Sequence, residues 1–372
     1  MSILATGYAS SILLSGKSEK TILAEIERGH IQMAAIFPST DEEFPQTGFA
    51  SNLYLLHALV KARREHPAIP VAVCWPMSTV ALAGAVEAAE AGLIQPILVG
   101  PTMQIEQIAA DMKLDISSYR IINVSTEDEA AVQCIELCRT GRAAALMKGS
   151  LHTDLLMHYV IAKDAGLRTQ RRISHVFVME APLYNRTLLI TDATINISPT
   201  LEDKVDIVQN AIDLAHAFGI AVPRVAILSA VETVNPKMIS TLDAAALCKM
   251  ADRQQITGAI LDGPLAFDTA VSAEAAAVKN LNTPVAGVAD ILLVPDLESG
   301  NMLAKQLEYL GGARLAGIVL GAKVPIILTS RADPPESRVA SCAIASLLAQ
   351  VQAESASKRW TGPSSSVSPR TT

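Results

Sequence analysis

Short apolar runs alternate with amphipathic stretches from about residue 70 to residue 350, and this rhythm constrains the fold more than any other feature. The longer stretches, such as Glu127–Arg139 and Leu201–Phe218, carry apolar residues three and four positions apart, the spacing of a helix with one buried face. The alternation predicts an α/β protein with mostly parallel sheets flanked by helices. The strand-like runs are Val71–Cys74, Pro96–Val99, Arg120–Val124, Ala143–Met147, Ser174–Met179, Leu188–Thr191, Arg224–Ser229, Ala259–Leu261, Asp290–Val294, Leu315–Leu320 and Val324–Leu328.

One pair of runs departs from this rhythm, because no helical pattern separates Ser174–Met179 from Thr187–Thr191. The link between them includes Pro182–Asn185, a short segment with residues that favour turns. We therefore expect a hairpin here, which makes the second sheet a mixed one.

Composition narrows the class of partner. Half of the 372 residues are hydrophobic and the net charge is −7, which argues against nucleic acid as the main partner. The apolar stretch 68–86 is interrupted by prolines, so we expect no membrane span, and Met1–Leu14 lacks the early positive charges of a signal peptide. The cysteines show no framework spacing, which predicts reduced thiols in a cytoplasmic protein. They are Cys74, Cys134, Cys138, Cys248 and Cys342.

The segment after the last strand-like run has the chemistry of an anion site. Val324–Leu328 leads directly into Thr329, Ser330 and Arg331, and a double proline then opens a helix with Asp333 as its expected N-cap. Two hydroxyls, a guanidinium and a helix N-terminus at the carboxyl end of a strand suit a doubly charged oxyanion. Ligands bind at that end of the strands in open α/β sheets, so we expect a phosphate site.

A second turn of this kind follows the run Ala143–Met147. Lys148, Ser150 and Thr153 can reach an anion there, and Gly149 lets the backbone come close. The turn also holds His152 at the expected start of a helix.

Three further polar segments follow strand-like runs. In the segment 192–200, helix capping explains Thr200 but leaves Asp192 and Asn196 without a structural role. Asp262 opens a turn that holds a second acid, and a small polar loop ends at Asn301 before an expected helix.

Two other motifs are weaker. Ser11–Ser18 resembles a phosphate-binding loop but has serine where the first glycine belongs, and the chain contains no Gly-x-Gly-x-x-Gly. Cys134 and Cys138 stand four apart on one helix without an obvious third ligand, so packing is favoured over metal binding.

Five segments in this order resemble the phosphate acetyltransferase and phosphate butyryltransferase family, with an ending closer to the butyryltransferase branch. The resemblance covers about residues 70–350 and rests on Lys-Gly-Ser-Leu-His-Thr (148–153), Thr-Asp-Ala-Thr-Ile-Asn-Ile-Ser-Pro-Thr (191–200), Asp-Gly-Pro-Leu-Ala-Phe-Asp (262–268), Val-Pro-Asp-Leu-Glu-Ser-Gly-Asn (294–301) and Thr-Ser-Arg-Ala-Asp (329–333). It implies reversible transfer of an acetyl or butyryl group between coenzyme A and inorganic phosphate. Coenzyme A is then a substrate, with no tightly bound cofactor or metal, and the protein is a homodimer or larger homo-oligomer.

The resemblance also implies roles for individual residues. Phosphate or acyl phosphate would be bound by Thr329, Ser330, Arg331, Lys148, Ser150, His152 and Asn301, and coenzyme A or the cleft wall would involve Asp192, Asn196, Asp262 and Ser337. In the acetyltransferases an Asp seven residues after the Ser of Ser-Arg is the candidate base, and Ser337 stands at that position here. We therefore assign the catalytic roles to Ser330, Arg331 and the neighbouring Glu336, whose place in the first helical turn keeps it ionised. A histidine such as His152 as the base, or a reaction without an enzyme base, stays open as an alternative. The family's arginine after the Gly-x-x-His segment is also absent, leaving His158 there.

The implied architecture has two α/β domains, like that of isocitrate and isopropylmalate dehydrogenases, with the active site in the cleft between them. Domain I is expected at 68–168 plus 319–352 and domain II at 169–318. Residues 1–67 form an N-terminal extension, and the composition of 353–372 predicts a disordered tail.

Three other functions remain open at this point. An acyl-carrier-protein:phosphate acyltransferase would need a basic docking patch, which the acidic balance disfavours. A decarboxylating dehydrogenase of related fold would need more clustered aspartates than Asp262 and Asp268 supply. A catalytically weak relative that only binds coenzyme A is the third.

The first prediction tests the phosphate role of Arg331. Arg331→Lys keeps the charge but loses the two-pronged donor geometry of the guanidinium. We expect the Michaelis constant for phosphate or acyl phosphate to rise and turnover to fall by ~10–1000-fold, the range for losing one transition-state donor. Steady-state kinetics measure both, and unchanged kinetics in a folded variant would remove Arg331 from the site.

Overall fold

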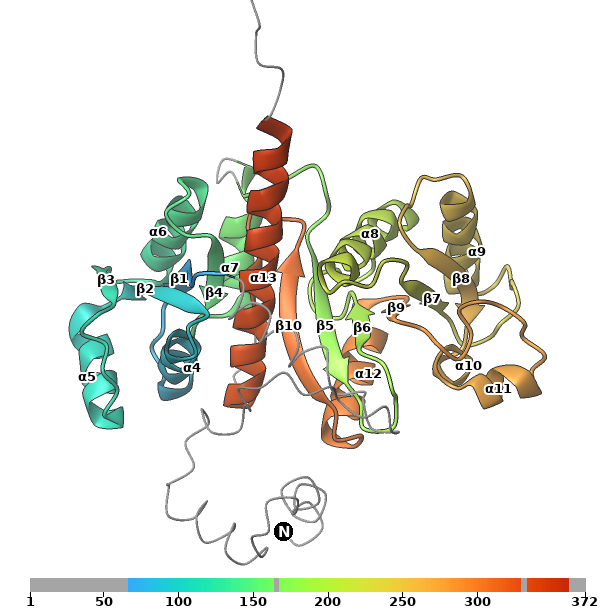
Figure 1. The fold of residues 1–372 in the computed structure, drawn as a ribbon, viewed down its shortest axis with the longest axis horizontal. Coiled ribbons are helices and arrows are strands. Elements are labelled where there is room, and N and C mark those ends of the chain that lie inside the picture. The colour runs from blue at the N-terminus through green and yellow to red at the C-terminus, as the bar shows by residue number, and fades with distance from the viewer. Residues whose placement is uncertain (1–65, 164–166, 329–332, 361–372) are drawn as a thin grey trace, which may run out of the picture. The chain divides into compact units, whose positions relative to one another are not determined.

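The computed structural model describes residues 66–163, 167–328 and 333–360, with side chains described up to residue 354. All of these residues belong to one compact unit. Its strands form a single eleven-stranded sheet in the order β3-β2-β1-β4-β11-β10-β5-β6-β9-β7-β8 (Figure 1). The strands are β1 Ile69–Cys74, β2 Ile94–Gly100, β3 Arg120–Asn123, β4 Ala145–Lys148, β5 Ser174–Glu180, β6 Leu188–Thr191, β7 Arg224–Leu228, β8 Ile260–Leu265, β9 Ile291–Leu293, β10 Arg314–Leu320 and β11 Ile326–Ile327.

Two sets of parallel strands run in opposite directions in this sheet. The strands β1, β2, β3, β4 and β11 are parallel to one another, as are β6, β7, β8 and β9. The long strands β5 and β10 join the two sets through the antiparallel pairs β11–β10, β10–β5 and β5–β6. The predicted hairpin is thereby confirmed. The expected second sheet is not a separate one, because β10 and β5 pair and join all the described strands into one sheet, which is mixed only at its centre.

The strand register brings the carboxyl ends of both sets to one level of the sheet. A row of directly paired residues crosses it: Val73, Met147, Ile327, Ile318, Val176, Thr191, Leu293 and Ile227. We call this set the transverse row. The residues that follow it in the parallel strands include Lys148, Leu328 and Asp192, so segments from both sets leave the sheet at the same level.

Helices cover both faces of the sheet. On one face α4, α5, α8, α9 and α13 share a single apolar core with strands of both sets. The helix α13 packs against α4, β10, β11 and α8, and Figure 1 shows it alongside β10. The other face carries α6, α7, α10, α11 and α12. The helices are α4 Thr79–Glu90, α5 Thr102–Met112, α6 Glu127–Arg139, α7 Thr153–Ile161, α8 Leu201–Ala217, α9 Ile239–Asp252, α10 Phe267–Val271, α11 Ala273–Val278, α12 Leu297–Tyr309 and α13 Pro335–Trp360.

The second face has two separate cores instead of one. One core gathers side chains of α6, α7 and the first set of strands, and the other gathers side chains of α12 and the second set. On β10, Val319 belongs to the first core and Leu315 to the second, and Gly317 lies between them on the same face. We call the place where these two cores meet, at Gly317, the seam.

The fold class predicted from the sequence is confirmed, and two boundaries differ from the expected ones. The helix α12 begins at Leu297 because the Asp296 carboxylate accepts a hydrogen bond from the Ser299 backbone N–H, so Asn301 lies on a helix where a loop was expected. The helix α13 continues to Trp360, so 353–360 is helical where composition predicts a disordered tail. The division into domains I and II stays a prediction.

None of the helices in the described ranges is both long enough and apolar enough to cross a membrane.

Candidate active site

The turn after β4 is built around a buried lysine. Lys148 ends the strand, and its ammonium group donates to the carbonyl oxygens of Gly149 at 3.2 Å and Leu151 at 3.1 Å. Two fixed acceptors orient a cation that is only 7% exposed. A buried and oriented ammonium group is a suitable counter-charge for phosphate.

Gly149 is required in this turn by the close approach of β1. A Cβ atom at this position would lie 2.4 Å from the carbonyl oxygens of both Cys74 and Trp75. The backbone N–H groups of Gly149 and Ser150 donate to those two oxygens, each at 2.8 Å. The hydroxyl of Ser150 also donates to that of Ser78, the N-cap of α4, at 3.0 Å. The predicted phosphate turn is therefore held rigidly against the end of β1.

The turn after β6 folds around the buried carboxylate of Asp192. One oxygen accepts from the backbone N–H groups of Thr194 and Ile195 at 2.9 and 3.0 Å, and the other accepts from the backbone and side-chain N–H groups of Asn196. Burial raises the pKa of Asp192 above its usual value, and these hydrogen bonds offset part of that rise. The carboxylate thus shapes the turn, which we call the Asp192 turn.

Asn196 connects this turn to β5 and α8. Its side-chain amide donates to the carbonyl of Ile173 at 2.9 Å, and its oxygen accepts from Nε of Arg172 at 2.7 Å. Arg172 forms a further ion pair with Asp203 at 3.1 Å. Both residues that capping left unexplained are therefore accounted for by the bonds that hold the turn, and their contact with coenzyme A stays a prediction.

The helix α12 brings the second set of strands toward the segment before α13. Asn301 donates to the carbonyl of Ala193 in the Asp192 turn at 3.2 Å. One helical turn further along, the ammonium of Lys305 lies 3.8 Å from the carboxylate of Asp333. A single helix therefore spans the distance from the Asp192 turn to residues that directly follow Thr-Ser-Arg-Ala.

Thr329, Ser330 and Arg331 lie outside the described residues. Leu328, the residue before them, is buried at the end of β11. On the other side of the gap, Glu336 is exposed in the first turn of α13, whereas Ser337 is 5% exposed and its carbonyl accepts from the Ser341 hydroxyl. Glu336 therefore offers a solvent-accessible carboxylate, whereas the hydroxyl-bearing side chain of Ser337 is buried.

Two predicted site residues lie differently from the rest. His152 is exposed at the N-cap position of α7 and makes no capping hydrogen bond with its side chain. Asp262 lies within the edge strand β8, beside Cys248 of α9, whose pKa burial and then the Asp262 charge raise to about 12. Since β8 is three strands from β6, about 14 Å away, the structure does not bring Asp262 to the Asp192 turn.

Sequence reasoning missed His175. It lies on β5 in the same direction as Phe177, is fully buried, and places its Nδ1 3.3 Å from the hydroxyl of Thr194. Among the described residues its Nε2 has no hydrogen-bond partner. Burial lowers the imidazole pKa, and the nearby carbonyl of Leu328 offsets only a small part of that lowering. A single histidine inside an otherwise apolar strand was the signal that could have identified it.

All five cysteines are free thiols, as their spacing predicts. Burial raises the pKa of Cys138 and Cys342 to about 12, which keeps both protonated and unreactive. Within the described part of the chain, no three His, Cys, Asp or Glu side chains are grouped so that they could hold a metal ion.

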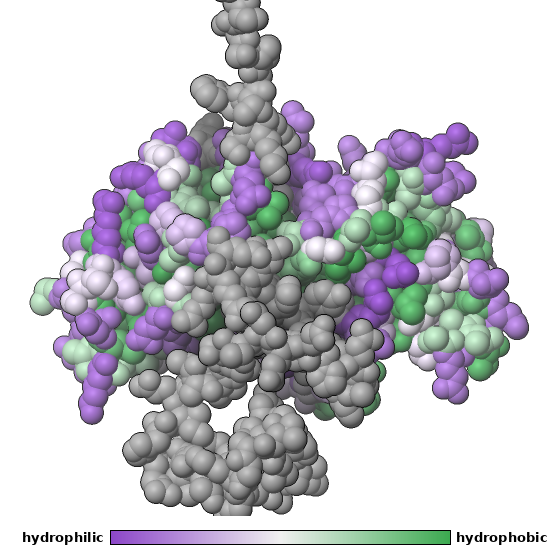
Figure 2. Space-filling model, in the orientation of Figure 1, coloured by the Kyte–Doolittle hydropathy of each residue, from purple (hydrophilic) through white to green (hydrophobic). Residues whose placement is uncertain are grey.

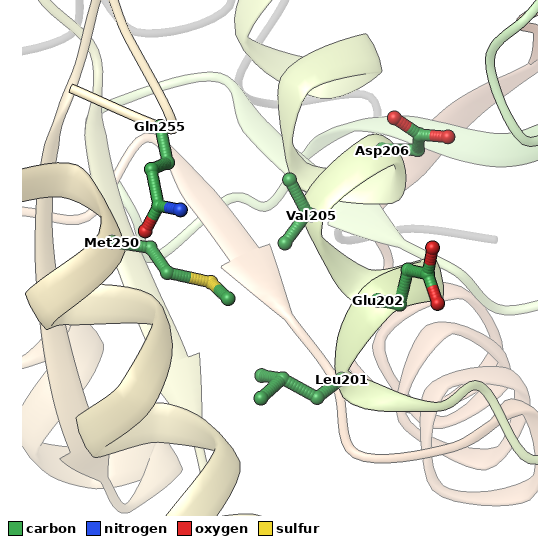
Figure 3. A pocket seen from close by; sticks show the side chains of 6 residues that line it. All are labelled: Leu201, Glu202, Val205, Asp206, Met250 and Gln255. Carbon is green, nitrogen blue, oxygen red and sulfur yellow. The ribbon is translucent and has the colours of Figure 1, made fainter. Parts of the chain in front are cut away.

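A hollow of about 440 Å³ lies between α8 and α9. Figure 2 shows hydrophobic surface where these helices lie, and in Figure 3 Val205 of α8 and Met250 of α9 point into the space between them. The hollow is lined by Leu201, Glu202, Val205, Asp206, Met250 and Gln255. None of these is a predicted site residue.

Comparison with known proteins identifies the class. The family model described as phosphate acetyl/butaryl transferase matches residues 125–346. A phosphate acetyltransferase of Rhizobium meliloti is 60% identical over 78% of this chain and 92% of its own length. A phosphate butyryltransferase of Clostridium beijerinckii is 43% identical over 78% of this chain and 96% of its own. The protein is an acyltransferase, and it belongs to the phosphate acetyl/butaryl transferase family.

Solved structures agree on the fold. The branched-chain phosphotransacylase from Enterococcus faecalis V583 superimposes with a TM-score of 0.67 at 32% identity, covering 76% of this chain and 99% of that one. The EutD phosphotransacetylase from Staphylococcus aureus, at 21% identity and a TM-score of 0.65, shares the fold.

The buried imidazole predicts a pH-dependent stability. Burial lowers the pKa of His175 to about 3 in the folded protein, whereas an unfolded histidine titrates near ~6.5. Between these values only the unfolded state binds the proton, so stability falls as pH drops below about 6.5, by ~1.4 kcal/mol per pH unit. His175→Gln removes this proton, so its loss of unfolding free energy between pH 7.5 and 5.5 should be smaller by ~1.4 kcal/mol.

Denaturant unfolding of both proteins at the two pH values measures this difference. Asp192 contributes equally to both proteins, because its carboxylate is unchanged by the substitution. An identical pH dependence in the two proteins would contradict the burial of His175.

Proposed function

We propose that this protein transfers a short acyl group, acetyl or butyryl, between coenzyme A and inorganic phosphate: acyl-CoA + phosphate = acyl phosphate + CoA. One structural observation carries the proposal beyond family membership. The transverse row brings three segments to one level of the sheet: the turn that begins at Lys148 after β4, which we call the Lys148 turn, the Asp192 turn, and the end of β11, which precedes Thr329–Arg331. Ligand sites in α/β proteins form where strand direction or order changes at carboxyl ends.

Phosphate recognition is assigned to the first set of strands. The buried ammonium of Lys148 and the hydroxyl of Ser150 support a doubly charged oxyanion at the β4 turn. Arg331, Ser330 and Thr329 are proposed to complete the site from the end of β11, and Asn301 and His152 to border it. A fixed guanidinium binds two phosphate oxygens at once, which a lysine cannot do.

The reaction needs a nucleophile, an oxyanion site and a base. In the direction of thioester formation, the thiol of coenzyme A loses its proton to a base and its sulfur attacks the carbonyl carbon of the acyl phosphate. The tetrahedral oxyanion collapses, the carbon–oxygen bond to phosphate breaks, and phosphate leaves with the bonding electrons. We assign stabilisation of the oxyanion to Ser330 and of the leaving phosphate to Arg331.

Glu336 is the base in this proposal. Its exposed carboxylate lies in the first turn of α13. Ser337 is too buried and lacks the basicity, and Asp333 faces the cation of Lys305. Asp192, Asn196, Asp262 and Ser337 remain proposed contacts of coenzyme A or of the cleft wall.

The proposal extends to the setting of the enzyme. Coenzyme A enters as a substrate, and no tightly bound cofactor takes part. We infer a cytoplasmic homodimer or larger homo-oligomer from the resemblance to the family.

The third prediction is the activity itself. The full chain, mixed with coenzyme A and acetyl phosphate or butyryl phosphate without added metal, should form a thioester that ultraviolet absorbance follows. The ratio of kcat/KM for the two acyl phosphates then gives the acyl preference. If neither yields a thioester, the alternatives are a carrier-protein:phosphate acyltransferase, tested with acyl carrier protein in place of coenzyme A, and a catalytically weak coenzyme A-binding relative.

The fourth prediction concerns the base. Glu336→Gln keeps the shape and removes the basicity, so turnover at pH 7 should fall about 100-fold, as for loss of a general base. At pH 9 the thiolate is abundant without assistance, and the two proteins should converge. Glu87→Gln is the matched control, since it removes a carboxylate whose pKa is raised by burial and then by Glu336. A gap that is equally wide at both pH values would contradict the role of Glu336.

A further inference from the structure

The seam on the second face of the sheet is occupied by an imidazole in place of apolar packing. His175 lies opposite Val319 of β10, next to the position where the two cores separate. Its ring is fully buried and contacts Phe177 edge-on, with the ring centroids 4.4 Å apart. A polar ring in a position that an aliphatic side chain would fill costs desolvation free energy unless its nitrogens are used.

One nitrogen of the ring faces the Asp192 turn. Nδ1 lies 3.3 Å from the hydroxyl of Thr194, and the backbone N–H of Thr194 donates to the Asp192 carboxylate at 2.9 Å. The backbone of His175 in β5 is also held to β6, because the hydroxyl of Thr191, the last residue of β6, donates to the carbonyl of His175 at 2.8 Å. His175 is therefore joined to the end of β6 through both its backbone and its ring.

The other nitrogen faces the end of β11. A Cβ atom placed on Gly317 would lie 2.9 Å from Nε2 of His175 and 2.7 Å from the carbonyl oxygen of Leu328. Both atoms thus crowd the same point above Gly317, and the missing side chain of this glycine lets them approach each other. Nε2 forms no hydrogen bond among the described residues, but its nearest polar neighbour here is a carbonyl oxygen, which can only accept. The tautomer that suits both surroundings therefore carries its N–H on Nε2 and leaves Nδ1 to accept from Thr194.

We propose that His175 is a positioning residue for acyl transfer, which fixes the distance between the Asp192 turn and the peptide at which the chain leaves β11. This inference rests on the proposed function, because it assigns the two ends of the imidazole to the two sides of that site. Burial keeps the ring neutral, since its pKa is lowered to about 3, so the arrangement of donor and acceptor does not change at physiological pH. The ring touches no substrate in this mechanism, and its effect passes through Leu328 and Thr194.

Three substitutions separate positioning from packing. His175→Gln has an amide that reaches as far as Nε2 and can still donate toward Leu328, whereas the amide of His175→Asn reaches only as far as Nδ1. His175→Phe keeps the volume of the ring and removes both ring nitrogens. If His175 positions the site, kcat for thioester formation should stay within about 3-fold of the parent for Gln. It should fall ~10–100-fold for Asn and Phe, the range for a small misplacement of catalytic groups.

Michaelis constants should change less than about 3-fold in all three variants, because no substrate contact is removed. A role in packing alone predicts the opposite order, in which Phe is active and Gln and Asn are impaired in proportion to their loss of stability. That order, or equal kcat in all variants, overturns the proposal. Circular dichroism at the assay temperature verifies that each variant is folded.

A second route keeps the inference testable if the His175 variants fail to fold. Gly317→Ala places a methyl group between Nε2 and the Leu328 carbonyl, and it should lower kcat as His175→Asn does. Thr194→Val keeps the shape and removes the hydroxyl that Nδ1 contacts; His175→Gln loses the same contact, so kcat should again stay within about 3-fold of the parent. A parent protein without thioester formation contradicts the proposed function, whereas an active parent with a fully active Gly317→Ala variant contradicts only the role of His175.

Discussion

The antiparallel pairing of β5 with β10 is the interaction on which the rest of the structure depends. It joins two sets of parallel strands that run in opposite directions, and its register stops both sets at the transverse row. Parallel strands release their loops only at their ends, so a site that combines loops of both sets has to form where those ends meet. A shift of two residues in this pairing would move the Lys148 turn and the Asp192 turn apart by about 7 Å.

The loops at this row hold their shape through buried polar groups. The carboxylate of Asp192 is enclosed by N–H donors, and the ammonium of Lys148 is held by two carbonyl oxygens. An unpaired buried charge would cost several kcal/mol, so conformations of these turns that keep the charge buried but break its hydrogen bonds are disfavoured. Rigid turns suit a reaction in which the enzyme mainly orients two substrates and stabilises an oxyanion.

The two faces of the sheet serve different purposes. One continuous core, closed by α13, holds the strands of both sets together, whereas the opposite face is divided at the seam. Polar chemistry is possible at the seam because apolar packing is interrupted there. His175 and Gly317 lie at this interruption, so the same feature that divides the core also connects the loops.

The sequence by itself determined the fold class, the hairpin and the order of the polar segments, because each follows from local periodicity, turn chemistry or motif. It also determined the family, since the five motifs occur in the right order, and the comparisons confirm this. The turn held by Asp192 and Asn196 and the start of α12 at Leu297 rest on contacts within four residues, so they were local features that the sequence interpretation missed. Local pattern could not show that Asp262 lies apart on an edge strand, because that depends on which strands pair and in which order. Only the tertiary structure decided that a histidine in an apolar strand faces two loops from distant parts of the chain, because such a contact leaves no trace in the residues on either side of it.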